Sequence, residues 1–243
     1  APDVVINATA YTAVDQAEED QEIAGLVNHL AVLNIAEACA KLDSWFVHVS
    51  TDYVFDGEST EPYKESAQTA PQGVYGVTKL KGELAIQSSG CLHLIIRTAW
   101  VFSEHGNNFL KTMLRLGAER DELSIVGDQF GCPTYAQDIA LVIVEALAYM
   151  KFKKCASGVY HFCGDESCSW YDFANAIFHE AKMLGFKTPN TIHSIETDAY
   201  PTAASRPSFS ALDCSKIKMA FGVEASNWND GVVKSLKRIL KCT

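Results

Sequence analysis

The chain has 243 residues, of which 48% are hydrophobic, 21% charged and 10% aromatic. This globular composition excludes disordered, collagen-like and coiled-coil proteins. The length exceeds a typical domain of about 150 residues and leaves room for two interlocked lobes. With 20 basic and 30 acidic residues, the net charge is −10. Such a charge repels phosphate backbones and anionic lipids, so we expect neither a nucleic-acid nor a membrane partner.

Cysteine usage and hydropathy indicate the compartment. The eight cysteines are scattered and form no Cys-x-x-Cys pair, which is typical of reduced thiols in a cytosolic enzyme. The longest apolar stretch, residues 139–150, is shorter than the ~18 residues that a membrane span requires. We recognise no signal peptide and expect a cytoplasmic protein.

The first hundred residues alternate between strand and helix patterns. The apolar run 4–8 predicts a strand buried on both faces. Residues 18–42 predict a helix with acidic residues in its first turn. Strands are expected at 45–49 and 92–97, with a helix at 75–88 between them. This alternation predicts an α/β protein with a doubly wound parallel sheet.

Beyond Trp100 the alternation loosens, which indicates a second, smaller lobe of mixed α/β structure. Helices are predicted at 108–120 and 138–150. Ser169 has the pattern of an N-cap that opens another helix. A final amphipathic helix is expected at 228–240.

The strongest candidate for chemistry is the group Thr51, Tyr75 and Lys79. Tyr75 and Lys79 are four residues apart, so they share one helix face, and a nearby ammonium favours an ionised phenol. Such a phenol can donate or accept a proton. Thr51 ends a predicted parallel strand, at the edge where open α/β sheets bind ligands. Its hydroxyl could therefore hold a substrate oxygen beside the tyrosine.

Two other patterns are weaker. Tyr149 and Lys153 repeat the Tyr-x-x-x-Lys spacing, but they lie at a basic helix end with no Ser or Thr strand end before them, which favours a solvated last turn. His161 and Cys163 share one face of a predicted strand, with Cys168 nearby in the chain. No second pair of ligands accompanies them, so we expect no metal site.

Motifs along the whole chain resemble those of the extended short-chain dehydrogenases, and more narrowly those of the dTDP-4-dehydrorhamnose reductase family. The wider resemblance rests on Asn7-Ala8-Thr9-Ala10, Val27-Asn28 with Asn34, Ser50-Thr51 and Tyr75-Gly76-Val77-Thr78-Lys79. The narrower one rests on Thr12-Ala13-Val14-Asp15, Ser50 to Gly57, Arg97 to Val101, Gly106 to Phe109, Asp128 to Thr134, Trp170 to Ala174 and Ser205-Arg206-Pro207.

The resemblance implies a Rossmann-like fold and a reductase. It would use NADPH or NADH to reduce the C4 ketone of a dTDP-4-dehydro-6-deoxyhexose, the last step in making dTDP-rhamnose for cell-surface polysaccharide. By resemblance, Tyr75 would protonate the developing alkoxide. Lys79 would lower the pKa of Tyr75 and hold the cofactor ribose, while Thr51 would orient the carbonyl.

The resemblance also implies binding residues. Ala8, Thr9 and Ala10 would line the cofactor's ribose side, where small residues allow close approach to the backbone. Asp52 and Trp100 would contact the dTDP-sugar substrate, although Trp100 also fits a core aromatic residue between the lobes.

Two polar residues admit two interpretations each. Arg206 is the candidate for the substrate diphosphate, because a guanidinium binds phosphate bidentately, and a surface salt bridge is an equal alternative. Asn28 belongs to the family motif and also suits a residue that braces the sheet through side-chain hydrogen bonds.

Alternative functions differ at a few positions. In 4,6-dehydratases of nucleotide sugars, Asp-Glu follows the Thr, whereas Asp52-Tyr53 stands here, which favours simple ketone reduction. A non-catalytic regulatory subunit resembling the beta subunit of methionine adenosyltransferase is the runner-up, and another nucleotide-sugar ketoreductase or epimerase remains open. A homodimer is compatible with each alternative.

The sequence contains no Gly-x-x-Gly-x-x-Gly turn to cradle a pyrophosphate. In the resembling family this turn opens the protein, so we expect an N-terminal section with at least one βαβ unit to be missing and the chain as given to bind NAD(P)H poorly. The choice between NAD and NADP is then unreadable. We expect a partial NAD(P)-binding domain at 1–101 and 134–157, and a substrate-binding lobe at 102–133 and 158–243.

Overall fold

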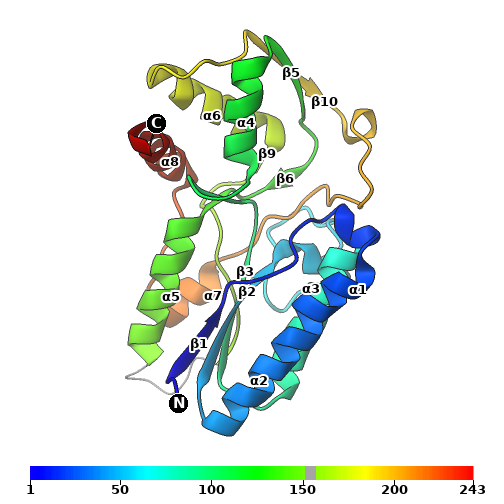
Figure 1. Cartoon of the computed structure of the whole chain (residues 1–243), viewed down its shortest axis with the longest axis vertical. Coiled ribbons are helices and arrows are strands. Elements are labelled where there is room, and N and C mark those ends of the chain that lie inside the picture. Colours follow the sequence, from blue (N-terminus) through cyan, green and yellow to red (C-terminus); the bar gives the residue numbers. More distant parts are fainter. Residues whose placement is uncertain (151–156, 243) are drawn as a thin grey trace.

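The computed structural model describes residues 1–150 and 157–242, which form two lobes (Figure 1). The larger lobe is built on a four-stranded parallel sheet with the strand order β1-β2-β3-β8. These strands are β1 (Val4–Asn7), β2 (Trp45–Thr51), β3 (His93–Thr98) and β8 (Gly158–His161). The predicted parallel α/β sheet is therefore confirmed.

Helices cover both faces of this sheet. Neighbouring residues of β2 alternate between the faces, as the period of a strand requires. Phe46 packs under α2 (Ala31–Leu42) and α3 (Val74–Ser88). Val47 packs on the other face, under α5 (Ala136–Met150) and α7 (Ser215–Phe221). Because both faces are covered, β2 and β3 carry the apolar runs seen in the sequence. The edge strand β1 is less covered than expected, with Ile6 51% exposed.

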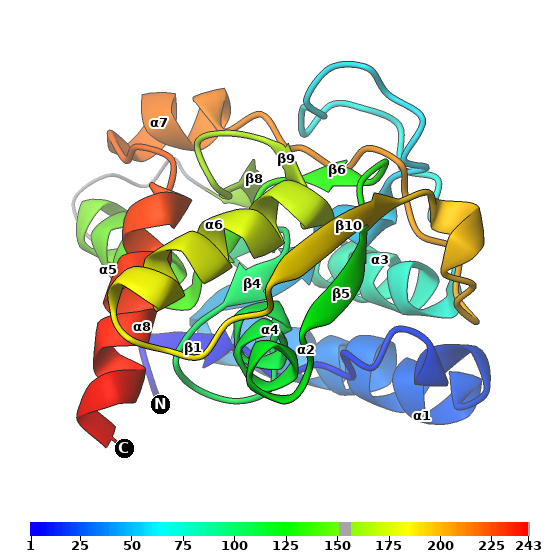
Figure 2. The ribbon, with the colours of Figure 1, turned by 90° about the horizontal axis from the view of Figure 1, so that it is seen from above.

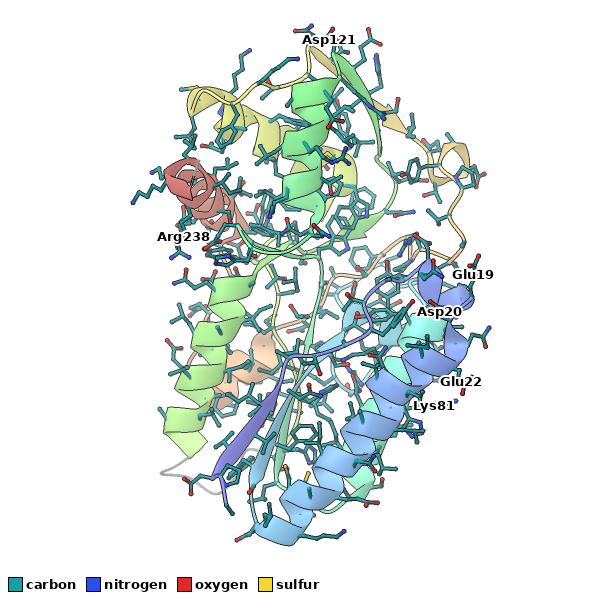
Figure 3. All side chains as sticks on the ribbon, in the orientation of Figure 1. Glu19, Asp20, Glu22, Lys81, Asp121 and Arg238 are labelled. Atoms are coloured by element: carbon teal, nitrogen blue, oxygen red, sulfur yellow. The ribbon has the colours of Figure 1, made fainter. Side chains whose placement is uncertain are left out.

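The helix expected at 18–42 forms as a continuous helix from Gln21 to Leu42 with a wider turn in it, preceded by a separate short turn of helix. The short turn is η1 (Gln16–Glu18), and the parts of the continuous helix are α1 (Gln21–Gly25), the π-helical η2 (Leu26–Leu30) and α2 (Ala31–Leu42). Glu19, Asp20 and Glu22 project from the surface at its start (Figure 3), so acidic residues lie where the helix dipole favours them. Among the described residues, Gln21–Leu42 is the one helix long and apolar enough to cross a membrane. It packs here against α3 and β2.

The smaller lobe holds three helices around an aromatic core, with short strand pairs beside them (Figure 2). The helices are α4 (Phe109–Glu119), α6 (Trp170–Met183) and α8 (Trp228–Cys242). The strand pairs are β5 (Glu122–Val126) with β10 (Thr191–Ile195), β4 (Val101–Phe102) with β7 (Thr134–Tyr135), and β6 (Phe130–Gly131) with β9 (Cys168–Ser169). Ser169 caps α6 in a capping box with Asp172, as its N-cap pattern predicts.

The boundary between the lobes differs from the sequence expectation at two segments. Thr134 and Tyr135 are expected in the larger lobe, but β7 pairs with β4 and Tyr135 joins the core of the smaller lobe. Residues 158–243 are expected in the second lobe, but β8 pairs with β3 in the sheet. Ile217 and Phe221 of α7 then join the core on the sheet's α5 face. The chain after residue 157 thus returns to the larger lobe. The sequence does not predict this, because the residues of a four-residue strand do not indicate which strand it pairs with.

Candidate active site

Thr51, Tyr75 and Lys79 come together at the carboxyl end of β2. Thr51 is the last residue of β2, and α3 carries Tyr75 and Lys79 one turn apart. Lys79 is 1% exposed, and its Nζ donates to the Val49 carbonyl at 2.7 Å. It also lies 3.1 Å from Nε2 of His48. Burial lowers the pKa of Lys79 to about 8, although Glu83 acts in the opposite direction.

The environment of the Tyr75 hydroxyl differs from the sequence expectation. The ring is partly exposed, but desolvation of the hydroxyl raises its pKa above the ordinary value. The Thr51 hydroxyl works against this effect, and the charge of Asp52 adds to it. The expected lowering by Lys79 is not seen in this structure, where burial dominates and Nζ is hydrogen-bonded to β2 instead.

Asp52 is a buried carboxyl group with one unsatisfied oxygen. It is 3% exposed, and Thr51 Oγ1 donates to its Oδ1 at 2.9 Å. Among the described residues, Oδ2 has no hydrogen-bond partner. Burial raises the pKa of Asp52 to about 6, although the Thr51 hydroxyl and the nearby Ser210 hydroxyl favour the charged form. The Ser210 Oγ makes no hydrogen bond to Oδ2 or to any other described residue. An acceptor buried without a partner is costly unless a ligand donates to it.

The raised pKa of Asp52 predicts a pH-dependent gain in stability for Asp52→Asn. The folded-state pKa near 6 exceeds the model value of 3.8, so the carboxyl stabilises the fold most at low pH and this contribution is lost as pH rises through 6. Two pKa units correspond to about 3 kcal/mol. We therefore expect Asp52→Asn to raise the free energy of unfolding by about 1–3 kcal/mol near pH 7.5 and by little near pH 4.

Urea unfolding at the two pH values measures this difference. Asp56→Asn is the matched control, because the hydrogen bond from Tyr63 lowers the pKa of Asp56. Asp56→Asn should lower the free energy of unfolding near neutral pH, whereas Asp52→Asn should raise it. A variant Asp52→Asn no more stable than the parent at pH ~7.5 would contradict the assignment of a strained buried carboxylate.

Arg206 reaches the site through Tyr53. Its guanidinium forms an ion pair with Asp15 at 2.5 Å and donates to the Tyr53 hydroxyl at 3.0 Å. The Tyr53 ring meets the Tyr75 ring edge-on, with centroids 5.5 Å apart. The salt bridge considered from the sequence is therefore present. Binding of a diphosphate by Arg206 stays a prediction, and the guanidinium has N–H groups beyond those that these two contacts use.

Trp100 lies where the two lobes meet. It follows β3 with a positive φ of 48°, an unusual conformation for a bulky residue that marks a constrained position. Its indole stacks on Trp170 of α6, with ring centroids 3.4 Å apart. The side chain is only partly buried. The packing on Trp170 agrees with a core aromatic residue between the lobes. Contact of the exposed part of the ring with a ligand stays a prediction.

Gly131 makes the position of Trp100 testable. A Cβ at Gly131 would lie 2.5 Å from Cε2 of the indole, so Gly131→Ala must displace Trp100 from Trp170. We expect a loss of about 1–3 kcal/mol in stability, as for other overpacked sites, and a change in tryptophan fluorescence. Gly25→Ala is the control, because a Cβ there meets no atom within 4 Å. Unchanged fluorescence in Gly131→Ala would contradict this packing.

The loop after β1 offers small residues at the same sheet edge. Ala8 and Thr9 are exposed and Ala10 is partly exposed. Asn28 holds the chain that follows: its Oδ1 accepts from the Tyr11 backbone N–H, and its Nδ2 donates to the Tyr11 carbonyl and to Thr78 of α3. The bracing role considered for Asn28 is therefore present, but it braces this loop and α3 rather than the sheet itself.

Two residues of the site were missed from the sequence. His48 is fully buried in β2 and contacts Lys79; a histidine inside an apolar strand, three residues before Thr51, was the available signal. Gly76 is in the first turn of α3 and faces the turn after β2, where a Cβ would come 2.2 Å from the Tyr53 carbonyl oxygen. Only glycine lets α3 start this close to the strand end.

The other candidates lie apart from this site. His161 Nδ1 contacts the Tyr63 carbonyl oxygen and its Nε2 faces Arg97, so both ring nitrogens already face protein groups. The described residues contain no group of three metal-ligating side chains. Of the second Tyr-x-x-x-Lys pair, Lys153 lies outside the described residues.

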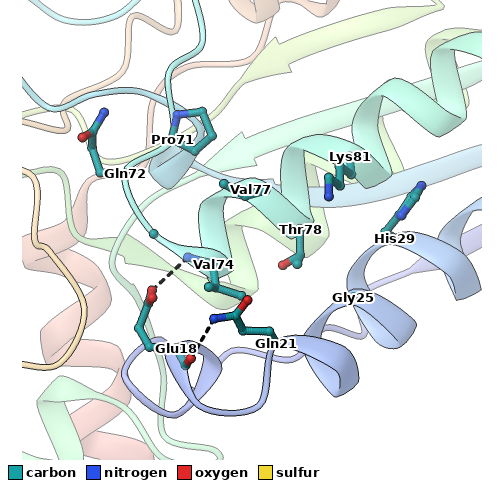
Figure 4. Close-up of a pocket in the computed structure, with 11 residues that line it drawn as sticks. Glu18, Gln21, Gly25, His29, Pro71, Gln72, Val74, Val77, Thr78 and Lys81 are labelled. Atoms are coloured by element: carbon teal, nitrogen blue, oxygen red, sulfur yellow. Dashed lines mark hydrogen bonds between the residues drawn. The ribbon is translucent and has the colours of Figure 1, made fainter.

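A surface hollow of about 440 Å³ lies between α1, η2 and the start of α3 (Figure 4). Glu18 closes its end by accepting a hydrogen bond from the Val74 backbone N–H at 2.8 Å. His29 and Lys81 line it, whereas Thr51, Tyr75 and Lys79 do not. The hollow is therefore distinct from the candidate active site.

The geometry defines a class of protein. A parallel α/β sheet whose second strand ends in Ser-Thr, beside a helix that carries Tyr-x-x-x-Lys, has the arrangement of the extended short-chain dehydrogenases and reductases. Within that class, the chain belongs to the RmlD substrate binding domain family, which matches residues 1–241.

Named relatives agree with this assignment. The chain is 42% identical over 243 residues to the dTDP-4-dehydrorhamnose reductase of Escherichia coli K12, covering 100% of this chain and 81% of that one. It is 46% identical over 242 residues to the reductase of Aggregatibacter actinomycetemcomitans, covering 98% and 80%.

Solved structures show the same fold. A dTDP-4-dehydrorhamnose reductase from Clostridium acetobutylicum superposes with a TM-score of 0.91 at 36% identity, covering 98% of this chain and 81% of that one. The reductase from Bacillus anthracis, in complex with NADP, gives a TM-score of 0.88 at 34% identity, covering 100% and 81%.

Proposed function

We propose that this protein uses NADPH or NADH to reduce the C4 ketone of dTDP-4-dehydro-6-deoxy-L-mannose, forming dTDP-L-rhamnose. The observation that carries the proposal is the convergence of Thr51, Tyr75 and Lys79 at one sheet edge. The chain that contains them is 42–46% identical over nearly its whole length to reductases of this name.

The residues present fit a nicotinamide nucleotide on the β1 side of the site. Ala8 and Thr9 leave the strand end open, and Lys79 Nζ has two partners on β2. Only the Val49 carbonyl must accept from Nζ, so at least one N–H of Nζ is left for a ribose hydroxyl whichever way the His48 contact runs. When bound, the nicotinamide supplies the hydride.

The chain's own residues supply a proton and position the sugar. Tyr75 donates its phenolic proton to the oxygen that becomes the C4 hydroxyl. Thr51 donates its hydroxyl proton to Asp52 Oδ1 in this structure, and when substrate binds it would turn that proton to the C4 carbonyl oxygen and orient it beside Tyr75. The unpartnered Oδ2 of Asp52 accepts a hydrogen bond from a sugar hydroxyl, which compensates the cost of burying it.

Trp100 and Arg206 complete the proposed substrate site. The exposed part of the Trp100 ring packs on the apolar side of the deoxysugar. Arg206 donates a hydrogen bond to the Tyr53 hydroxyl, and the Tyr53 ring in turn contacts the ring of Tyr75. The remaining N–H groups of Arg206 bind the diphosphate.

The direct test follows loss of NADPH or NADH absorbance with dTDP-4-dehydro-6-deoxy-L-mannose, and identifies dTDP-L-rhamnose by mass and chromatography. The cofactor concentration is raised until the rate no longer changes, because weak cofactor binding is expected of the chain as given. The same assay with a UDP-4-keto sugar tests whether the enzyme accepts another nucleotide sugar. Turnover of the UDP compound alone would overturn the substrate assignment. No turnover, together with copurification of a methionine adenosyltransferase, would favour the regulatory alternative.

A further inference from the structure

A line of buried polar groups leads from the end of β1 to the candidate catalytic lysine. Asn7 of β1, His48 of β2 and Lys79 of α3 lie side by side, at 6%, 0% and 1% exposure. Asn7 Nδ2 is 3.2 Å from His48 Nδ1, and His48 Nε2 is 3.1 Å from Lys79 Nζ. Because these groups are buried, water cannot replace a badly matched hydrogen-bond partner. Each contact therefore needs one donor and one acceptor.

The orientation of the Asn7 amide follows from its other contacts. Its Oδ1 accepts from the backbone N–H of Thr9 at 3.0 Å and from the Thr9 hydroxyl at 2.7 Å. A backbone N–H can only donate, so the oxygen must face Thr9 and the NH₂ group must face His48. Nδ1 of His48 is then the acceptor, and it carries no proton.

This orientation sets the tautomer of His48. Burial lowers the pKa of His48 well below its ordinary value, so the ring is neutral. A neutral ring with a bare Nδ1 carries its proton on Nε2. That N–H points at Nζ of Lys79, and only an unprotonated amine has a lone pair to accept it. A lysine ammonium would instead face an N–H directed at it.

We propose that His48 is a positioning residue which, oriented by Asn7, donates a hydrogen bond to Lys79 and favours the amine form of the lysine. This inference rests on the proposed function for its place in catalysis, but its geometry does not depend on the substrate. The titratable groups that face Lys79 among the described residues are His48 from β2 and Glu83 from α3, and Glu83 favours the ammonium. The two neighbours thus act on the lysine in opposite directions.

The tautomer of His48 is the first measurement. In the ¹⁵N-labelled protein, long-range ¹H–¹⁵N spectra separate protonated from bare ring nitrogens, and His48→Asn identifies the signal. We expect a proton on Nε2 and none on Nδ1 at neutral pH. A proton on Nδ1, or on both nitrogens, would overturn the proposal. This measurement uses the unmodified protein, so it does not depend on any variant's folding.

The second measurement reverses the hydrogen bond. In Asn7→Asp, a carboxylate accepts from His48 Nδ1–H, so the tautomer reverses and Nε2 becomes an acceptor for the Lys79 ammonium. We expect the pKa of Lys79, followed by the ¹³C shift of its Cε, to rise by about one unit or more. His161→Asn is the matched control, because His161 is equally buried but faces Arg97 instead of Lys79. It should leave the pKa of Lys79 unchanged.

Each outcome decides the proposal. A raised lysine pKa together with a proton on Nδ1 supports it. If the pKa of Lys79 rises but the tautomer of His48 does not change, the added negative charge alone explains the rise. If the pKa of Lys79 does not change, Asn7 has no influence on the lysine. Either result overturns the proposal. None of these readouts requires turnover, so they stand even if the proposed substrate is wrong.

Discussion

Replacement of Tyr75 by Phe is expected to abolish turnover of dTDP-4-dehydro-6-deoxy-L-mannose while affinity for the nicotinamide nucleotide changes little. The variant keeps the ring that packs edge-on against Tyr53 and removes only the hydroxyl beside Thr51. The developing alkoxide then has no proton donor, and general acid catalysis of this kind contributes about 10²–10⁴-fold to the rate. The measurement is single-turnover oxidation of NADPH, with cofactor affinity measured separately by fluorescence.

Tyr63→Phe is the matched control for this loss. Tyr63 is also largely buried and also donates a hydrogen bond, to Asp56. It belongs to a different part of the core, packed against Phe55, so its loss should cost stability rather than activity. If Tyr75→Phe retained full turnover, the proton donor would have to be another group, and the proposed chemistry would be wrong.

Replacement of Glu83 by Leu is expected to destabilise the fold by about 3–5 kcal/mol, the cost of leaving a buried charge without its partner. Glu83 is 0% exposed and Arg97 4%. Arg97 donates to both carboxylate oxygens, with Nη2 at 2.6 Å from Oε2 and Nε at 3.0 Å from Oε1. Ser50 donates to the same carboxylate. Without Glu83, the contacts that remain for the Arg97 guanidinium among the described residues are the Phe55 ring, at 5.1 Å, and His161 Nε2, at 3.5 Å.

A double-mutant cycle measures the interaction energy between Glu83 and Arg97 separately from the effect of each single substitution. Arg97→Met should also destabilise, whereas Glu83→Leu with Arg97→Met should recover much of the loss, because an apolar pair of similar volume replaces a buried ion pair at small cost. Urea unfolding of the four proteins gives the coupling energy. Strictly additive losses would show that Glu83 and Arg97 act independently. The cycle also concerns the site, because Ser50 precedes Thr51 directly.

The sequence predicts the fold best where one pattern repeats over many residues. The strand at 45–49 and the helix at 75–88 appear as β2 and α3 within two residues of their expected ends. The short strands β4, β6, β7 and β9 have two residues each. Their pairing depends on which distant segments the core brings together, so local periodicity does not reveal them.

The candidate site was predictable as a set of residues but not as an environment. The order of strand, Ser-Thr and Tyr-x-x-x-Lys placed Thr51, Tyr75 and Lys79 together. The direction of the pKa shift at Tyr75 could not be foreseen, because it depends on how deeply the phenol is desolvated. His48 escaped notice for the same reason: only the packing of α3 over β2 turns an ordinary strand histidine into the neighbour of Lys79.

The path of the chain between the lobes has an evolutionary consequence. The polypeptide leaves the sheet after β3, returns through α5 and β8, leaves again for α6 and β10, returns through α7 and ends in α8 (Figure 1). Neither lobe is one contiguous stretch of sequence. A single genetic crossover therefore cannot exchange the smaller lobe for that of a relative, as it can between domains joined by one linker. New sugar preferences in this architecture must arise by substitutions within interleaved segments rather than by domain shuffling.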